Sequence, residues 1–189
     1  QKQIFDKTIF VTGAAGSIGS ELVRQLSKFN PKKIILIDVA ESSLYEIEIE
    51  LKSIFHLRSF EIMIADIRNE ERIESLFKKY NPQIIFHAAA YKHVPMMEHH
   101  PVEAIKTNVF GTKILADLAT KYKVEKFVMI STDKAVNPTS VMGASKRIAE
   151  MYVQSLGKES NTKFITTRFG NVLGSNGSAV QLFNHQIEK

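Results

Sequence analysis

Short apolar runs and longer amphipathic runs alternate along almost the whole chain. The short runs are rich in β-branched residues and are nearly continuous in apolar character, which is typical of strands covered on both faces. The longer runs repeat apolar residues every three or four positions, as amphipathic helices do. This alternation predicts βαβ units and a parallel sheet. The expected strands are 8–12, 33–38, 60–65, 84–88, 127–131 and 164–168, and the expected helices are 17–29, 42–55, 70–80, 102–122 and 141–160.

The run over residues 42–55 fits two interpretations. Between residues 46 and 51, apolar residues alternate with glutamates, which is the period of a strand. Over a wider window the apolar residues form a helical stripe, and the run is too long for an ordinary strand. We therefore predict a helix here. Six strands with helical crossovers predict a doubly wound α/β sheet of the Rossmann type, in which ligands bind outside the carboxyl ends of the strands.

A glycine loop follows the first expected strand. Gly13, Gly16 and Gly19 are three residues apart, and the run from Ser17 opens a helix. In dinucleotide-binding units the first glycine allows a tight turn, the second lets the backbone approach a pyrophosphate, and the third lets the helix pack on the strand. The phosphates would lie at the helix N-terminus, where free amides and the helix dipole favour anions. The expected cofactor contacts here are Gly13, Ala15, Gly16, Ser17, Ile18 and Gly19.

Asp38 ends the second expected strand, nineteen residues after Gly19. A carboxylate at this place can accept hydrogen bonds from both hydroxyls of an adenosine ribose and disfavours a 2′-phosphate, so NAD is preferred over NADP. The alternative is that Asp38 caps the following turn or helix. After the third strand, the run Ala65-Asp66-Ile67-Arg68 places a polar pair where an adenine edge could lie, with Asp66 and Ile67 as the expected cofactor contacts. After the fourth strand, Ala88, Ala89 and Ala90 are expected to form a wall of small residues.

Candidate catalytic residues follow the fifth expected strand. Ser131-Thr132-Asp133-Lys134 precedes Met142-Gly143-Ala144-Ser145-Lys146, which lies at the start of a helix. With the glycine loop, this arrangement resembles the extended short-chain dehydrogenase/reductases, which carry Ser or Thr after this strand and Tyr-x-x-x-Lys on this helix. The runs STDKAVNPTSVMGASKR and HAAAYKHVPMMEHHPVEAIKTNVFGT resemble in particular the UDP-N-acetylglucosamine 4,6-dehydratase branch of bacterial polysaccharide biosynthesis proteins. The resemblance covers essentially the whole chain.

Met142 occupies the tyrosine position of the broader family, and methionine cannot take or give a proton. The resembled branch carries this replacement, so the chain is not interpreted as an inactive enzyme. Tyr152 is no substitute, because six residues from Lys146 correspond to about 240° around a helix. The group that assists at the sugar C4 hydroxyl is therefore expected among Thr132, Asp133 and Lys134.

The resemblance implies a closed redox cycle. A hydride leaves the sugar C4 for the nicotinamide, water is lost across C5 and C6, and the hydride returns to C6. This chemistry needs an acid for the C6 hydroxyl and a base for C5. We assign Asp133 as the acid and Lys134 as the base, with the pKa of Lys134 lowered by burial or by nearby Lys146. Lys146 is expected to hold the nicotinamide ribose. The alternative is an ordinary surface Asp-Lys turn.

The resemblance also implies further contacts. Lys92 and Asn108 are expected beside the cofactor, and the substrate contacts are expected to be Lys92, Arg168, Asn171 and Ser175. Ser175 belongs to a glycine-rich loop over residues 174–178, which is equally compatible with a plain connection. The expected partner is a UDP-sugar.

Composition narrows the remaining possibilities. With 189 residues, 44% hydrophobic and 24% charged, the chain is globular rather than disordered. The net charge of +5 comes from lysines and arginines that mostly alternate with acids, so we expect no nucleic acid partner. Histidines 93, 99 and 100 with Glu98 lack metal-site spacing, and cysteine is absent, so no metal is expected.

The chain begins at Gln1 and stops at Lys189 within an apolar-periodic run, so we expect a fragment of a longer protein. It would comprise one dinucleotide-binding domain, with a substrate-binding region starting near residue 170. No run is long enough for a membrane span or resembles a signal peptide. We expect a cytoplasmic homo-oligomer without membrane contact from this segment, or the cytoplasmic domain of a membrane-anchored protein. Competing functions are a nucleotide-sugar 4-epimerase and a non-catalytic NAD-binding fragment.

Overall fold

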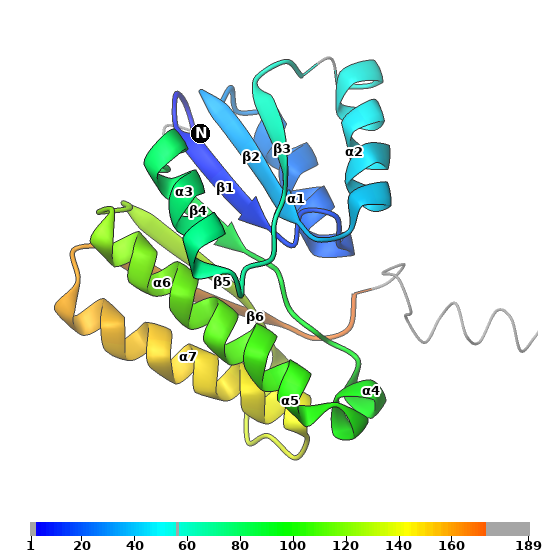
Figure 1. The fold of residues 1–189 in the computed structure, drawn as a ribbon, viewed down its shortest axis with the longest axis vertical. Helices are drawn as coiled ribbons and strands as arrows, with labels where there is room; N and C mark the ends of the chain where they lie inside the picture. The colour runs from blue at the N-terminus through cyan, green and yellow to red at the C-terminus, as the bar shows by residue number, and fades with distance from the viewer. Residues whose placement is uncertain (1–2, 56, 173–189) are drawn as a thin grey trace, which may run out of the picture.

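The computed structural model describes residues 3–55 and 57–172, which form a six-stranded parallel sheet with helices on both faces (Figure 1). The strand order is β3-β2-β1-β4-β5-β6, so the order reverses direction between β1 and β4. The doubly wound α/β fold expected from the sequence is confirmed, and each strand end lies within one residue of its expected position. The strands are β1 (Thr8–Thr12), β2 (Lys33–Asp38), β3 (Phe60–Ile64), β4 (Ile84–His87), β5 (Lys126–Thr132) and β6 (Lys163–Phe169).

Helices connect the strands. The first three are α1 (Ser17–Ser27), α2 (Glu41–Ser53) and α3 (Glu70–Tyr80). The run with two interpretations is therefore a helix, as expected. Leu44, Ile47 and Leu51 are buried, whereas Ile49 is 49% exposed. The strand-like alternation arises because Ile49 lies on the solvent face of α2 beside glutamates.

The segment between β4 and β5 differs from expectation. We expected a single helix over residues 102–122, and this prediction is wrong in detail. The segment contains three elements: α5 (Pro101–Ala104), a π-helix (Ile105–Gly111) and α6 (Thr112–Lys121). A π-helix inserts an extra residue into the turn, which a 3.6-residue period does not reveal. The preceding short helix α4 (Val94–His99) was not expected, because six residues are too few for a clear apolar period. The 3₁₀ turn η2 (Asp133–Ala135) and α7 (Val141–Glu159) follow β5.

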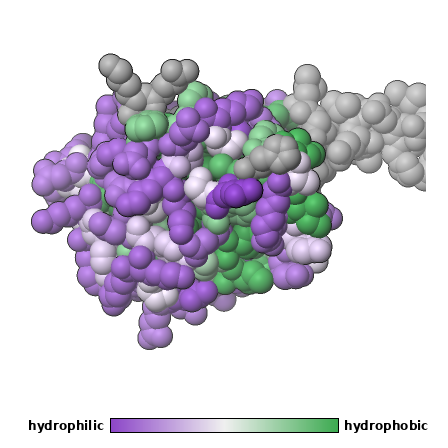
Figure 2. Space-filling view, turned by 90° about the horizontal axis from the view of Figure 1, so that it is seen from above, coloured by the Kyte–Doolittle hydropathy of each residue, from purple (hydrophilic) through white to green (hydrophobic). Residues whose placement is uncertain are grey.

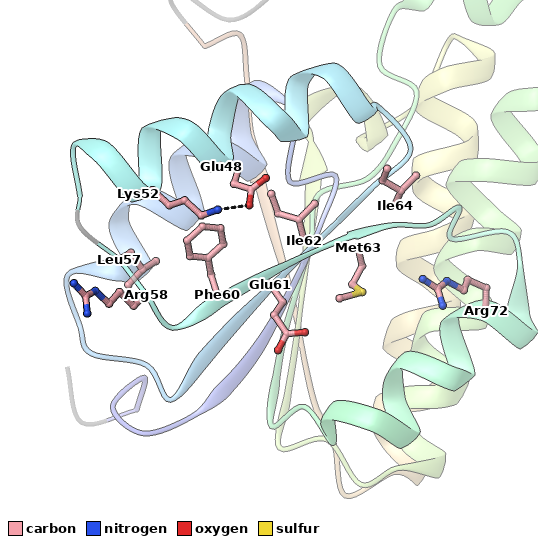
Figure 3. A pocket seen from close by; sticks show the side chains of 10 residues that line it. All are labelled: Glu48, Lys52, Leu57, Arg58, Phe60, Glu61, Ile62, Met63, Ile64 and Arg72. Atoms are coloured by element: carbon pink, nitrogen blue, oxygen red, sulfur yellow. Dashed lines mark hydrogen bonds and ion pairs between the residues drawn. The ribbon is translucent and has the colours of Figure 1, made fainter.

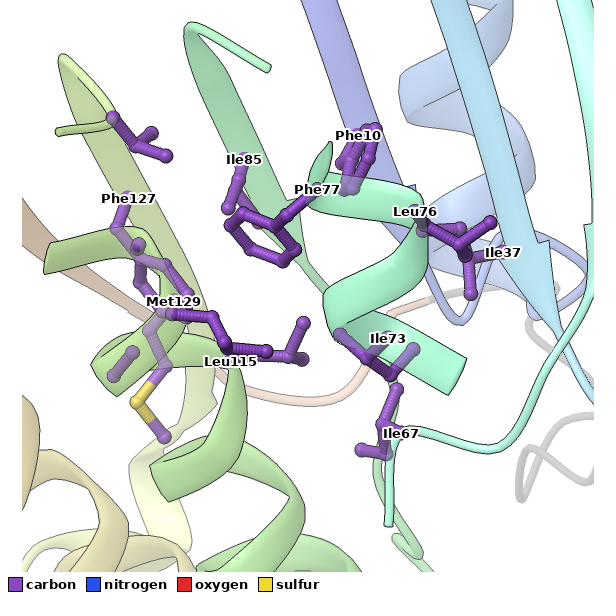
Figure 4. Close-up of a cluster of buried hydrophobic side chains, with 14 of the residues drawn as sticks. Phe10, Ile37, Ile67, Ile73, Leu76, Phe77, Ile85, Leu115, Phe127 and Met129 are labelled. Carbon is purple, nitrogen blue, oxygen red and sulfur yellow. The ribbon is translucent and has the colours of Figure 1, made fainter. Parts of the chain in front are cut away.

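Strand residues alternate between two apolar cores, one on each face of the sheet. Side chains on one face pack against α3, α6 and α7, and Figure 4 shows this cluster, with Phe10, Ile37, Ile85, Phe127 and Met129 from the strands. The neighbouring positions face α1 and α2 on the other side and include Ile9, Val11, Ile34, Leu36 and Ile84. Burial on both faces explains why the strands are continuous apolar runs.

The surface is largely hydrophilic, with an apolar area among the polar side chains on the face drawn in Figure 2. Exposed large apolar side chains include Tyr45, Ile49 and Ile54, which lie on or just after α2. Within the described residues, no helix has the length and apolar character needed to cross a bilayer.

Candidate functional site

A cavity of about 300 Å³ lies at the carboxyl ends of β1 to β4, where the strand order reverses. This is the place where open α/β sheets bind ligands. Its lining includes many of the positions expected from the sequence, namely Gly13, Ala15, Gly16, Asp38, Asp66, Ile67, Ala88, Ala89 and Ala90. It also includes Ala65 and Arg68, which belong to the run expected beside an adenine, and residues that the sequence did not single out: Ile37, Val39, Ala40, Tyr91 and Thr107.

The glycine loop leaves no room for side chains at two positions. Gly13 has φ +69°, and a Cβ there would lie 2.5 Å from the backbone nitrogen of Ala89. A Cβ at Gly19 would lie 2.0 Å from the Gly13 carbonyl oxygen. α1 starts at Ser17, and its N-cap residue Gly16 provides no side-chain cap. The first turn of α1 is therefore suited to an anion, because its backbone amides point outward without a side-chain acceptor at the cap.

Asp38 makes the turn contacts that the sequence offered as the alternative to ribose binding. Its Oδ2 accepts a hydrogen bond from the Ala15 amide at 3.0 Å, which ties it to the glycine loop. Its Oδ1 accepts from the amides of Val39 at 2.7 Å and Ala40 at 3.0 Å, which fixes the turn before α2. The carboxylate is thus held by backbone donors at the rim of the cavity.

Asp66 is paired with Arg68, the other member of the polar pair expected after the third strand. Arg68 donates to Asp66 Oδ2 from Nε at 2.9 Å and from Nη2 at 2.6 Å, and its Nη1 donates to Glu103 at 2.8 Å. The Arg68 hydrogen bond holds the pKa of the Asp66 carboxyl below its ordinary value. The Asp-x-Arg spacing was the available signal, but spacing alone does not show which acid the arginine joins.

Thr107 is one of the lining residues that the sequence did not indicate. It lies on the π-helix and lines the cavity. Its Oγ1 is buried, and among the described residues it has no hydrogen-bond partner. A buried hydroxyl without a partner is unfavourable unless a ligand or water satisfies it.

Asn108, expected beside the cofactor, is not among the residues that line the cavity. It is fully buried, accepting from the Tyr91 amide at 2.8 Å and donating to the Tyr91 carbonyl at 3.0 Å and to Ser145 Oγ at 2.9 Å. Its neighbour Thr112 bonds to His87, whose other ring nitrogen bonds to Thr12. This network connects β1, β4, the π-helix and α7.

Lys92, also expected at the cofactor, is exposed and outside the cavity lining.

Two buried titratable groups have strongly shifted pKa values. Burial lowers the pKa of His87 to about 3, with a smaller contribution from Lys146, so His87 is a neutral hydrogen-bonding group. Burial lowers the pKa of Lys146 to about 8, against the opposing effect of Glu150. Lys146 is 5% exposed, and its Nζ donates to the Ile130 carbonyl at 2.7 Å. The lysine with a burial-lowered pKa is therefore Lys146.

Thr132, Asp133, Lys134 and Asn171 come together at the end of β5. Asp133 Oδ1 accepts from Thr132 Oγ1 at 2.9 Å and from Lys134 Nζ at 3.3 Å, and Lys134 Nζ also donates to Asn171 Oδ1 at 3.2 Å. The Lys134 side chain is 41% exposed, so the burial expected to tune it is absent. The hydrogen bond from Thr132 lowers the pKa of Asp133, which is opposite to the shift that an acid requires.

The remaining expected residues have other surroundings. Met142 is buried with Met97 and Ala104 under α4, and Glu98 of α4 accepts a hydrogen bond from the Val141 amide. Tyr152 donates to Asp117 on α6, away from Lys146, as its spacing predicts. Arg168, expected to contact substrate, forms a bidentate ion pair with Glu150 instead. Ser175 and the loop over residues 174–178 lie outside the described residues.

A larger cavity of about 890 Å³ lies elsewhere, along the edge strand β3. Figure 3 shows Lys52 paired with Glu48 above Phe60 and Ile62. Arg58 lies just before β3, and Arg72 lies on α3. It flanks the sheet edge and lacks the glycine loop, so it is not the cofactor candidate. Across the part of the chain that the structure describes, no three His, Cys, Asp or Glu side chains gather as a metal-binding group.

Comparison with known proteins places this geometry in a family. The model of the family described as "Polysaccharide biosynthesis protein" matches residues 9–189. The capsular polysaccharide biosynthesis protein CapD of Staphylococcus aureus is 54% identical over 189 residues, which cover 99% of this chain and 32% of that protein. The X-ray structure of Pen from Bacillus thuringiensis aligns with a TM-score of 0.92 at 35% identity, covering 98% of this chain and 58% of that one.

Relatives with named activities are of two kinds. A UDP-N-acetylglucosamine 4,6-dehydratase (inverting) of Campylobacter jejuni is 35% identical over 185 residues, covering 96% of this chain and 54% of the enzyme. A UDP-glucose 4-epimerase of Rickettsia typhi is 34% identical over 191 residues, covering 97% of this chain and 54% of that enzyme. The chain thus spans about half the length of these relatives, and about a third of CapD. Since the family model matches nearly its whole length, the chain belongs to the polysaccharide biosynthesis protein family.

Proposed function

We propose that this chain is the dinucleotide-binding part of an NAD-dependent nucleotide-sugar 4,6-dehydratase that acts on UDP-N-acetylglucosamine. The observation that carries the proposal is the cavity at the reversal of strand order, with the glycine loop on one wall and Asp38 at its rim. When bound, NAD supplies a reversible hydride acceptor. The similarity to the Campylobacter dehydratase supports the choice of reaction.

The residues of the cavity fit a dinucleotide. The first turn of α1 has no side-chain cap at Gly16 and offers backbone donors to a diphosphate. Asp38 presents a carboxylate for ribose hydroxyls and would repel a 2′-phosphate, which supports NAD over NADP. Thr107 offers a buried hydroxyl that needs a partner. In this proposal Asp66 with Arg68 borders the adenine, and Ala88 to Ala90 form the wall beside the glycine loop.

The catalytic roles remain with the residues at the end of β5 and the start of α7. Lys146 would hold the nicotinamide ribose, because its buried ammonium lies where β5 and α7 meet. Thr132 would assist at the sugar C4 hydroxyl in the role of the tyrosine that Met142 replaces. Its hydroxyl already donates to the Asp133 carboxylate, which can take a proton. Asp133 and Lys134 would exchange protons with C5 and the C6 hydroxyl. A substrate that covers this exposed turn would remove water and raise the pKa of Asp133 towards an acid role.

The experiment follows the mass of the product. The full-length protein is incubated with UDP-N-acetylglucosamine, and the sugar nucleotide is analysed by mass spectrometry. Loss of one water is the expected result, with exchange of the C5 proton in deuterated solvent. Conserved mass would favour the second candidate, a nucleotide-sugar 4-epimerase, which the similarity to the Rickettsia enzyme supports. Cofactor binding without turnover would contradict both.

The pH dependence offers a second test. A Lys146 cation that assists turnover is present below its pKa of about 8 and is lost as the pH rises through that value. The turnover rate should therefore fall on the alkaline side of about pH 8. Lys146→Arg should move this alkaline limb upward, because arginine stays charged. An alkaline limb that does not move would show that another group controls it.

A further inference from the structure

Glu150 is a fully buried carboxylate on α7, one helical turn after Lys146. Burial raises the pKa of Glu150, but the interactions with Arg168, Ser131 and Arg147 together outweigh this effect, and the pKa of Glu150 lies below its ordinary value. Glu150 is therefore an anion inside the protein. It has no contact with the cavity that holds the proposed cofactor site, so its role has to be sought in what it connects.

Arg168 holds this anion with two parallel hydrogen bonds. Its Nε donates to Glu150 Oε1 at 2.9 Å, and its Nη2 donates to Oε2 at 2.6 Å. A bidentate arginine–carboxylate pair fixes orientation as well as distance, because both groups are planar. Arg147 adds only a single, longer contact of 3.3 Å, so the number and length of the hydrogen bonds distinguish the two arginines. The pair thus joins α7 to β6 in one geometry.

Each partner of the pair lies on an element that also carries or contacts a proposed catalytic group. On α7, Lys146 precedes Glu150 by four residues and donates to the Ile130 carbonyl of β5. On β6, Arg168 lies opposite Ser131 and is followed by Gly170, where a Cβ would lie 3.3 Å from Asp133 Oδ2. Asn171 then accepts from Lys134. The pair therefore connects the helix that carries Lys146 to the strand whose end contacts the turn at residues 132–134.

We propose that Glu150 and Arg168 are positioning residues for the dehydratase proposed above, and that their ion pair sets the placement of Lys146 relative to the turn at residues 132–134. This inference depends on the proposed function. It replaces the substrate contact that the sequence assigned to Arg168. The charged and titratable groups that influence Lys146 are Glu150 on its own helix and His87 on β4.

The test separates positioning from simple structural support. Removing Arg168 leaves the buried Glu150 charge without its bidentate partner, whereas neutralising both groups often restores stability. The full-length protein is therefore compared with Glu150→Gln, Arg168→Gln and the double variant, and with Arg147→Gln as the matched control. The measurements are the urea midpoint, NAD affinity, kcat and KM for UDP-N-acetylglucosamine.

The double variant should regain most of the urea midpoint lost by the single variants and should bind NAD within about threefold of the parent. Its kcat should stay roughly tenfold or more below the parent, with KM within about threefold. Arg168→Lys should behave similarly, because lysine cannot form the two parallel bonds. Arg147→Gln should change kcat by less than about twofold. A kcat that recovers together with stability would overturn the proposal, and so would a rise in KM alone.

A second readout does not require turnover. The acetylation rate of Lys146 is measured by mass spectrometry relative to exposed Lys158. Loss of the Glu150 charge leaves more of Lys146 uncharged, so Glu150→Gln and the double variant should raise this ratio roughly fivefold or more. An unchanged ratio would overturn the positioning role even in a protein that fails to dehydrate UDP-N-acetylglucosamine. Failure of the proposed function would instead appear as no turnover in the parent.

Discussion

The two halves of the candidate site are built from different materials. The half around β1 and β2 consists of backbone amides, small residues and one carboxylate, with Gly13 pressed against Ala89. The half around β5, β6 and α7 consists of charged side chains whose partners come from distant parts of the chain, such as Glu150 with Arg168. The first half depends on the absence of side chains, and the second depends on which side chains meet.

This difference decides how much could be predicted from the sequence. Glycine at residue 13 is required by a positive φ and a close backbone approach, so the glycine spacing between a strand and a helix indicates the loop. The strands were predicted to within a residue because burial on both faces requires continuous apolar runs. A doubly wound topology allows more than one strand order, but once the order is known, the place of the cavity follows from its reversal.

The second half could not be predicted in the same way. Nothing local in the sequence shows that Arg168 joins Glu150, or that burial acts on Lys146 rather than on Lys134. The π-helix that places Thr107 at the cavity differs from an α-helix by one residue per turn, which the apolar period does not resolve. Pairings of this kind depend on three-dimensional packing.

The largest effect is expected from filling the glycine loop. Gly13→Ala combines a strained φ with a Cβ that meets backbone at 2.5 Å, and should lower the free energy of unfolding by about 3 kcal/mol. NAD binding should be lost with it. Urea denaturation and calorimetry measure the two effects. Gly157→Ala is the control, because its Cβ meets only the Phe164 side chain and should change stability by less than about 1 kcal/mol. Equal losses of stability in Gly13→Ala and Gly157→Ala would contradict the special role of the glycine loop.

The next effect concerns His87, which links the two halves through Thr12 and Thr112. Its pKa of about 3 lies below the unfolded value near 6.5, so the unfolded chain binds the proton first and stability falls as the pH falls through this window. Between pH 7 and 5 the parent should lose about 2 kcal/mol more than His87→Gln. Urea titrations at both pH values provide the measurement, and parallel curves would refute a buried neutral histidine.

A smaller effect is expected at the rim of the cavity. Asp38→Asn keeps a hydrogen-bond acceptor but removes the charge, and should weaken NAD binding about tenfold while narrowing the preference over NADP. Fluorescence titration with both dinucleotides measures this. Asp6→Asn, an exposed aspartate near the N-terminus, is the matched control and should leave both affinities unchanged. A preference that survives in Asp38→Asn would remove this residue from ribose recognition.

The smallest effect is expected away from both halves. Lys52 pairs with Glu48 on the surface of α2, beside the larger cavity of Figure 3. Exposed pairs of this spacing contribute little, so Lys52→Ala should change the free energy of unfolding by less than about 0.5 kcal/mol and leave NAD affinity unchanged. A large loss of NAD affinity in this variant would point to the edge of the sheet as the binding place.

Hydrogen–deuterium exchange with and without NAD compares the two cavities in one experiment. The cofactor should slow exchange at the amides of residues 13–19, 38–40 and 107, with no change along β3. Protection along β3, or none at the glycine loop, would contradict a dinucleotide lying across the carboxyl ends of the strands.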